Sequence, residues 1–192
     1  MVVALADFEN LLKTMKASVD LKDALLSFKC NRDTDLQNFL TDKSVNFDKA
    51  DKTRTYLILD EEMFIAGRLF LLGYFSLAIK VLTVPDELSG SQRKKLDGKY
   101  SHIENGISAY LIGQLGKNDL YKDKITGRQL VFEAMKIIKE ARILVGGRVV
   151  YIECADNTKL IKFYENNGFS VFSRNKKSKL VQMITYISKF AG

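Results

Sequence analysis

The stretch that decides the fold is Gly127 to Val145, which reads GRQLVFEAMKIIKEARILV. Its apolar residues recur at helical spacing, while its charged residues fall on the opposite face, which predicts a long amphipathic helix. Gly146 and Gly147 end it, because glycine tolerates the left-handed conformation at a helix C-terminus. Apolar segments rich in β-formers stand on either side, ISAYLIGQL (107–115) and VVYIEC (149–154). We therefore predict a strand–helix–strand unit whose two strands run parallel.

The rest of the chain shows weaker patterns of the same two kinds. Further helices are predicted at residues 4–17, 34–46 and 157–166, either from the helical spacing of apolar residues or from a capping residue at the start of the segment. Runs of β-formers predict further strands at residues 55–59, 65–84, 169–172 and 180–187. Residues 60–62 read as a turn, so the strands on either side of it should be antiparallel, and residues 86–100 read as irregular with one helical turn. These patterns together predict an α/β fold with a mixed sheet.

Composition points to one folded domain with a basic surface. The chain has 192 residues, 46% of them apolar, with 30 Lys and Arg against 23 Asp and Glu, so its net charge is +7. Such a composition is ordinary for a globular domain and argues against disorder. The length and the lack of a linker predict a single domain over residues 1–192. The excess of basic residues favours an anionic partner.

The few cysteine and histidine residues exclude several classes of site. Cys30 and Cys154 are too few for a disulfide framework, and with His102 as the single histidine we expect no metal site. A Ser-His-Asp mechanism would have to use that one histidine. The N-terminus lacks the basic region of a signal peptide, so we expect a cytoplasmic protein with reduced thiols.

The apolar run 65–84 has nearly the length of a membrane span. Arg68 and Lys80 lie within it, and each would cost roughly 2.5–3.5 kcal/mol in the middle of a bilayer. Its β-branched and aromatic residues favour a buried strand. We therefore expect no contact with a membrane.

The loop before the long helix is the first candidate site and reads KITGRQ (124–129). A helix N-terminus exposes unpaired backbone N–H groups and a partial positive charge, which suits a phosphate. Gly127 would let a ligand approach the backbone, and Lys124 and Arg128 add positive charge. Taken alone, the same residues are also typical of a solvated helix start.

The second candidate segment reads NTKLIKFYENNGF (157–169). Leu160, Phe163 and Tyr164 fall on one helical face, so core packing is an alternative to a binding role. Asn157 is also compatible with a plain N-cap, since asparagine is favoured at that position.

The two segments together resemble the GNAT superfamily of acyl-CoA N-acyltransferases. The family pattern is a strand, a pyrophosphate loop of the form Gln/Arg-x-x-Gly-x-Gly/Ala, a long helix, a strand, and then Asn-x-x-Ala-x-x-x-Tyr with a closing Gly-Phe. Residues 107–172 follow it through ISAYLIGQLGKN, KITGRQ, VVYIECADN and NTKLIKFYENNGF. The departures are Lys124 for Gln/Arg, Gln129 for the second Gly/Ala and Leu160 for Ala.

This resemblance implies a mostly antiparallel sheet with a central, splayed parallel pair of strands, flanked by helices. It also implies an N-acetyltransferase that uses acetyl-CoA as co-substrate and moves the acetyl group to a primary amine by direct attack in a ternary complex. In that reading Tyr164 is the general acid that protonates the departing thiolate. The cofactor-binding residues would be Leu115, Gly116 and Lys117 for pantetheine, Lys124, Ile125, Thr126, Gly127, Arg128 and Gln129 for pyrophosphate, and Asn157 for pantetheine.

Some roles stay open in this reading. The general base is unassigned, with Glu104 and Glu153 as the nearest carboxylates to the strands concerned. Cys154 could act as a nucleophile, although a cysteine at the end of a central strand is more often inert.

The first half of the chain resembles the N-terminal half of GNAT toxins from bacterial toxin–antitoxin pairs, which acetylate the amino acid on charged tRNA. The likeness lies in FKCNRDTDLQNFLTDKS (28–44), TRTYLIL (53–59) and LLGYFSLAI (71–79). The acceptor is thus a small-molecule or peptide amine, or alternatively charged tRNA, which the basic charge would suit. A non-catalytic module that binds CoA or a partner protein is a further alternative, and a homodimer is left open.

Overall fold

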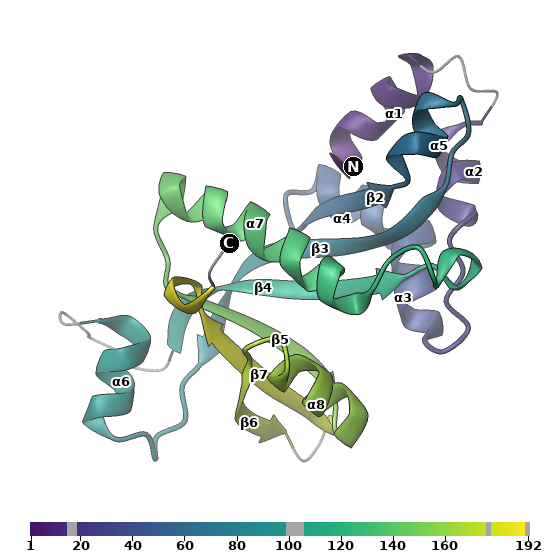
Figure 1. Ribbon diagram of the computed structural model, residues 1–192. Coiled ribbons are helices and arrows are strands. Elements are labelled where there is room, and N and C mark those ends of the chain that lie inside the picture. The colour runs from purple at the N-terminus through teal and green to yellow at the C-terminus, as the bar shows by residue number, and fades with distance from the viewer. Residues whose placement is uncertain (15–18, 99–105, 176–177, 191–192) are drawn as a thin grey trace. The chain divides into compact units, whose positions relative to one another are not determined.

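The computed structural model describes residues 1–14, 19–98, 106–175 and 178–190. Its strands form a seven-stranded sheet with the order β1-β2-β3-β4-β5-β7-β6 (Figure 1). The strands are β1 Val2–Ala4, β2 Arg54–Leu59, β3 Leu71–Thr83, β4 Gly106–Lys117, β5 Val149–Ala155, β6 Ser170–Asn175 and β7 Leu180–Tyr186. β4 and β5 pair in parallel, whereas β1–β2, β2–β3, β5–β7 and β6–β7 are antiparallel. The mixed, mostly antiparallel sheet that the sequence predicts is therefore confirmed.

Helices join and flank these strands. The α-helices are α1 Leu5–Thr14, α2 Leu21–Leu26, α3 Thr34–Asn38, α4 Ser44–Lys49, α5 Glu61–Ile65, α6 Gly90–Asp97, α7 Gly127–Val145 and α8 Thr158–Glu165. The short pieces are the π-helical η1 Phe39–Lys43 and the 3-10 turns η2 Asp119–Tyr121 and η3 Ile187–Lys189. The long helix α7 has the bounds that its sequence pattern predicts.

The parallel ladder between β4 and β5 is short. It runs through three residue pairs, from Tyr110 with Val150 to Ile112 with Ile152. Beyond that last pair β4 continues to Lys117 and β5 to Ala155.

Several element boundaries differ from the sequence prediction. The expected strand over 65–84 begins only at Leu71, because the Asp60 side chain accepts a hydrogen bond from the Met63 amide and starts α5 where a turn was expected. The capping box of Ser89 and Gln92 likewise gives α6 two turns instead of one. Among the helices described by the structure, none is long and apolar enough to cross a membrane.

The first half of the chain contains more short helices than its sequence suggests. The expected helix at 34–46 is divided into α3, η1 and α4 and extends to Lys49. The strand β1 and the helix α2 were not expected. Residues 15–17 of the first predicted helix, and residues 99 and 100 of the polar segment, lie outside the described portion of the chain.

The chain divides into two compact units. We call residues 1–78 and 113–134 the first unit, and residues 79–112 and 135–192 the second unit. The core of the first unit is built around Tyr74, which is fully buried and donates a hydrogen bond of 2.5 Å to the Leu36 carbonyl. Its ring meets Phe28 edge-on at 5.1 Å and is stacked on Phe39 at 6.4 Å between centroids.

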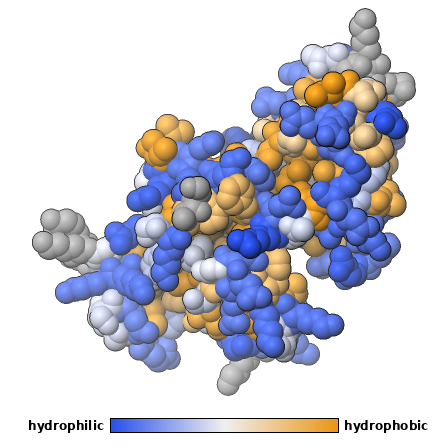
Figure 2. Space-filling view, viewed as in Figure 1, coloured by the Kyte–Doolittle hydropathy of each residue, from blue (hydrophilic) through white to orange (hydrophobic). Residues whose placement is uncertain are grey.

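The second unit has a separate apolar core, and the last turn of α7 does not belong to it. Leu82, Leu96, Val149 and Ile184 belong to this core. The end of α7 is outside it, with exposed fractions of 84% for Ile143, 83% for Leu144 and 65% for Val145. Figure 2 shows the corresponding hydrophobic patch over that helix end, so the apolar stripe of the sequence is only partly buried.

In the first unit, β3 and β4 approach each other closely at two glycines. A Cβ atom at Gly73 would lie 2.8 Å from the Gly116 carbonyl oxygen and 3.0 Å from a methyl group of Leu130. A Cβ atom at Gly116 would lie 3.0 Å from the rings of both Phe28 and Tyr74. This packing holds the end of β4, which is expected to bind the cofactor, against the aromatic core.

We expect Gly73→Ala to lower the free energy of unfolding by about 1–3 kcal/mol, because its methyl group would overlap a backbone oxygen that cannot move freely. Urea denaturation followed by circular dichroism would measure the change. Gly90→Ala is the matched control, because a Cβ atom at Gly90 in α6 has no neighbour within 4 Å. Equal stability of the two variants would contradict the proposed close packing.

Candidate functional site

The start of α7 carries unpaired backbone donors. Thr126 and Gln129 form a reciprocal pair, in which the Thr126 amide donates to Gln129 Oε1 at 2.8 Å and the Gln129 amide donates to Thr126 Oγ1 at 3.2 Å. The amides of Ile125, Gly127 and Arg128 donate to no residue within the described ranges. Three free donors at the N-terminus of a 19-residue helix form a site that suits a phosphate.

Lys124, which the sequence predicts to bind the pyrophosphate, contacts Asp60 and Phe70 within the first unit. Its Nζ atom lies 2.6 Å from Asp60 Oδ2 and 5.8 Å from the centroid of the Phe70 ring. The Asp60 side chain is only 11% exposed, so solvent weakens this ion pair less than it would a surface pair. The Lys124 ammonium, with a further hydrogen bond from the Met63 amide, lowers the pKa of Asp60. The positive charge of Lys124 is therefore largely neutralised by Asp60. The side chain of Arg128, by contrast, is exposed to solvent.

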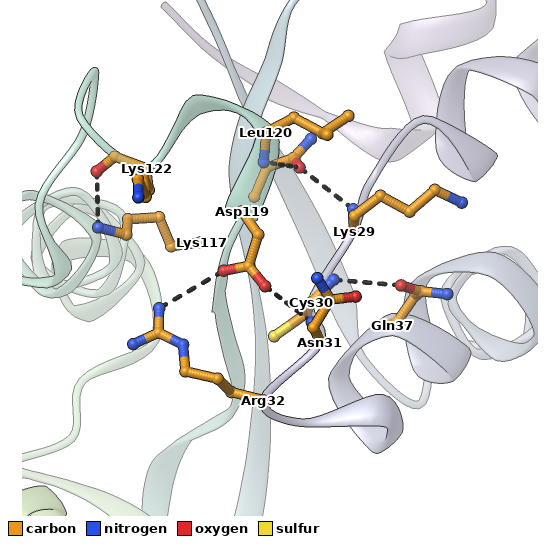
Figure 3. A network of polar contacts seen from close by, with 10 residues as sticks. Lys29, Cys30, Asn31, Arg32, Gln37, Lys117, Asp119, Leu120 and Lys122 are labelled. Atoms are coloured by element: carbon orange, nitrogen blue, oxygen red, sulfur yellow. Dashed lines mark hydrogen bonds and ion pairs between the residues drawn. The ribbon is translucent and has the colours of Figure 1, made fainter.

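The residues predicted to bind pantetheine lie at the end of β4. Leu115 and Lys117 are half-buried and Gly116 is buried. Lys117 Nζ donates to the Lys122 carbonyl at 2.7 Å, which closes the loop that follows the strand (Figure 3). The side chain of Lys117 is thus a structural contact within the first unit.

A buried asparagine that the sequence reading missed holds this strand end in place. Asn118 is fully buried, and its Nδ2 atom donates to the carbonyls of Leu71 at 2.7 Å and Ser27 at 3.2 Å. Its Oδ1 atom accepts from the amides of Lys29 at 3.2 Å and Leu120 at 3.1 Å. One carboxamide therefore joins three segments of the first unit. In the sequence, the only sign of this role is that Asn118 and Asp119 directly follow a predicted strand, and such a pair usually indicates a turn.

Asp119 extends this connection to the loop after α2. Its carboxylate accepts from the Asn31 amide at 2.7 Å and faces the Arg32 guanidinium at 3.5 Å (Figure 3). In the same loop, the Cys30 amide donates to Gln37 Oε1 at 3.1 Å. The segment 27–32 is therefore fixed to the chain that follows the predicted pantetheine strand.

In the second unit, Asn157 and Tyr164 lie at the two ends of one short helix. The Asn157 side-chain oxygen accepts from the Lys159 amide at 2.8 Å, so Asn157 is the N-cap of α8. The half-buried Tyr164 ring meets Phe163 and Phe169 edge-on, at 4.9 and 5.8 Å between centroids. The Tyr164 hydroxyl has no hydrogen-bond partner among the residues that the structure describes.

The chemistry around Tyr164 favours a proton donor. Burial raises the pKa of Tyr164 to about 12, and the neighbouring Cys154 adds to this rise. The hydroxyl therefore keeps its proton at neutral pH. Burial also raises the pKa of the Cys154 thiol, which makes it a poor nucleophile.

The carboxylates considered as a general base have different surroundings. Glu153 is exposed on β5, and its Oε1 atom accepts from Gln182 at 2.8 Å, while Gln182 in turn accepts from the Ser173 hydroxyl at 2.7 Å. Glu104 and His102 lie outside the described residues. Within the described ranges, no group of three His, Cys, Asp or Glu side chains is arranged to hold a metal ion.

We expect Asn118→Ala to lower the free energy of unfolding by at least about 2 kcal/mol, because it leaves buried carbonyls and amides without partners. Urea denaturation would measure the loss. Asn31→Ala is a suitable control, since only the backbone amide of Asn31 takes part in the network. A loss for Asn31→Ala as large as for Asn118→Ala would refute the special role of the buried carboxamide.

The ion pair of Asp60 and Lys124 predicts a pH dependence of stability. Because the folded pKa of Asp60 lies below its ordinary value of 3.8, the stabilisation is complete above that value and is lost as the pH falls through the folded pKa. The Asp60→Asn variant keeps an acceptor for the Met63 amide but loses the ion pair. Its free energy of unfolding should therefore fall below that of the wild type by the largest amount near pH 6, and by less toward pH 3. Chemical denaturation over this range tests it.

Lys124→Met provides the control for that experiment. In this background the carboxylate of Asp60 has lost its cation, so adding Asp60→Asn should change stability little at any pH. If Asp60→Asn, with Lys124 present, lowers the free energy of unfolding by the same amount from pH 6 to pH 3, the ion pair does not contribute to stability.

Comparison with known proteins identifies the fold. No protein-family model and no curated protein matches the sequence. Among solved structures, AtaT complexed with acetyl-methionyl-tRNAfMet is 21% identical with a TM-score of 0.68, over 95% of this chain and 92% of that one. A tyrosine-to-phenylalanine mutant of KacT is 19% identical with a TM-score of 0.69, over 98% and 95%. AtaTR bound with acetyl-CoA is 21% identical with a TM-score of 0.68, over 98% and 94%. The chain therefore has the GNAT-type fold that its sequence resemblance implies, and shares it with AtaT and KacT.

Proposed function

We propose that this protein is an acetyl-CoA-dependent N-acetyltransferase. The observation that carries the proposal is the start of α7, where the amides of Ile125, Gly127 and Arg128 are free to receive the pyrophosphate. Its support comes from AtaTR, a complex of the same fold whose structure contains acetyl-CoA. We also propose that the two units act as one domain, since β3, β4 and α7 each contribute residues to both.

The proposed cofactor contacts use backbone groups more than side chains. Pantetheine would pair with the backbone of Leu115 to Lys117 as an added strand does. Arg128 would supply the mobile positive charge at the pyrophosphate, since Lys124 is held by Asp60. Gln129 would release the Thr126 amide when the pyrophosphate arrives. Asn157 would donate from its amide nitrogen to pantetheine, because its oxygen already caps α8.

The proposed reaction is direct transfer. The neutral amine attacks the thioester carbonyl carbon, the new C–N bond forms, and the C–S bond breaks with its electron pair on sulfur. The Tyr164 hydroxyl then protonates the thiolate, and the amine loses its proton to a base or a water chain. Of the two carboxylates considered for that role, Glu153 is the one that lies within the described residues. Transfer through Cys154 is disfavoured, because burial keeps this thiol protonated.

For the acceptor, we propose the amino group of an aminoacyl-tRNA. The supporting observation is that AtaT, which has the same fold, was solved with acetyl-methionyl-tRNAfMet. The net charge of +7 suits an RNA substrate. A toxin of this kind would work in the cytoplasm beside an antitoxin, as the AtaT toxin is bound to the antitoxin AtaR in its complex. Acetylation of a small-molecule or peptide amine is the alternative.

The test is to incubate the protein with labelled acetyl-CoA and, in parallel, with charged tRNA, uncharged tRNA, peptides and small amines. We expect label on the amino acid of charged tRNA. Label on another amine would preserve the acetyltransferase and replace its acceptor. Failure to bind acetyl-CoA in a thermal-shift assay would point to a non-catalytic module instead.

Tyr164→Phe should lower kcat by roughly 100-fold or more while leaving acetyl-CoA affinity near that of the wild type, because it removes the proton donor and keeps the ring. Steady-state kinetics and calorimetric titration with acetyl-CoA would measure both. Tyr121→Phe is the matched control, since the stacking of that ring on Phe70 does not need the hydroxyl. Full activity of Tyr164→Phe would remove Tyr164 from the mechanism.

A further inference from the structure

The second unit contains a cavity of about 220 Å³ between α6 and the strands β6 and β7. Tyr186, at the end of β7, lines it together with Lys95 from α6 and Lys189 from η3. The Lys95 Nζ atom lies 5.5 Å from the centroid of the Tyr186 ring, and the Lys189 Nζ atom lies 5.6 Å from it. Two segments far apart in the sequence thus bring two ammonium groups to the same aromatic ring.

The positive charge of this cavity is not balanced by carboxylates. None of the residues that line it is acidic. Neither Lys95 nor Lys189 forms an ion pair in the described portion of the chain, where the ion pairs involve other cations. A third cation acts on the ring as well, because burial raises the pKa of Tyr186 while the Arg148 guanidinium opposes that rise. Like charges gathered without counter-charges attract anions.

The walls strengthen this attraction. Leu96, Phe172 and Ile184 form apolar walls, and Leu96 and Ile184 are buried. Apolar walls beside an open, charged mouth exclude water and focus the electric field on a ligand. The ring also holds both ammonium groups by cation–π attraction, so less side-chain entropy is lost when an anion binds.

We propose that Lys95, Tyr186 and Lys189 form a binding site for backbone phosphates of the RNA acceptor. This inference rests on the proposed tRNA acceptor and adds a contact region that the transfer chemistry does not use. A polyanion can offer a separate phosphate to each of the two ammonium groups, because the two lysines belong to separate elements.

The site is distinct from the proposed position of the thioester. Tyr186 pairs with Val149 at the start of β5, whereas Leu180 pairs with Ala155 at its end, next to Cys154 and Asn157. At about 3.3 Å per residue, the two ends of this strand are roughly 20 Å apart. An acetyl-CoA molecule bound beside Asn157 would therefore leave Tyr186 and its two lysines free for a remote portion of a long acceptor.

The test is the salt dependence of binding to uncharged tRNA without acetyl-CoA, measured by filter binding or fluorescence anisotropy. Lys95→Ala/Lys189→Ala should weaken binding roughly tenfold at physiological salt and lower the slope of log K against log salt by about 2, since two phosphate contacts are lost. Tyr186→Leu should weaken binding, and Tyr186→Phe should not, because phenylalanine keeps the cation–π contacts. Unchanged acetyl-CoA affinity and thermal unfolding would show that the variants are folded.

The matched control is Lys22→Ala/Lys49→Ala, which removes the same charge from two exposed lysines of the first unit. It should leave the salt slope near that of the wild type. A slope reduced equally by both double variants would overturn the site, even if charged tRNA is acetylated. A wild type that binds no tRNA but acetylates another amine would overturn both the site and the RNA acceptor, and would leave the acetyltransferase standing.

Discussion

The buried carboxamide of Asn118 is the interaction on which the candidate cofactor strand depends. It stands directly after β4 and binds backbone groups from the segments around Ser27, Lys29 and Leu71. A buried polar group is costly unless all its hydrogen bonds are made, so these segments must assemble together. The close approach at Gly73 and Gly116 then sets how near β4 lies to the aromatic core. The end of β4 is therefore held in place by contacts within the first unit.

The electrostatics of the proposed pyrophosphate loop, residues 124–129, follow from how the first unit is built. Asp60 caps α5 and takes up the charge of Lys124, and Gln129 covers the Thr126 amide. Positive potential at the loop thus comes from the helix start and from Arg128. If the cofactor is bound through backbone donors, as we propose, the identity of the side chains in the loop can vary, which would account for the departures of Lys124 and Gln129 from the family pattern.

Elements formed by contacts close in sequence were predictable. The helix α7, the strand β5 and the N-cap of α8 at Asn157 follow from periodicity and capping preferences. The segment 34–49 was not, because a π-helical turn arises where Phe39 and Leu40 turn into the core and interrupt the regular pattern. The strand β3 was predicted too long, because a single side chain, Asp60, starts a helix before it.

The sequence by itself determined the strand–helix–strand unit, the GNAT-type resemblance and the candidate roles of the 124–129 loop and Tyr164, since each depends on residues near one another in the chain. Only the tertiary structure decided which charges and amides are free. Lys124 meets Asp60 across 64 positions, Asn118 reaches Ser27 across 91, and Lys95 and Lys189 meet at one ring. Such partners are chosen by the packing of distant segments, and the strength of each interaction depends on the burial that this packing creates.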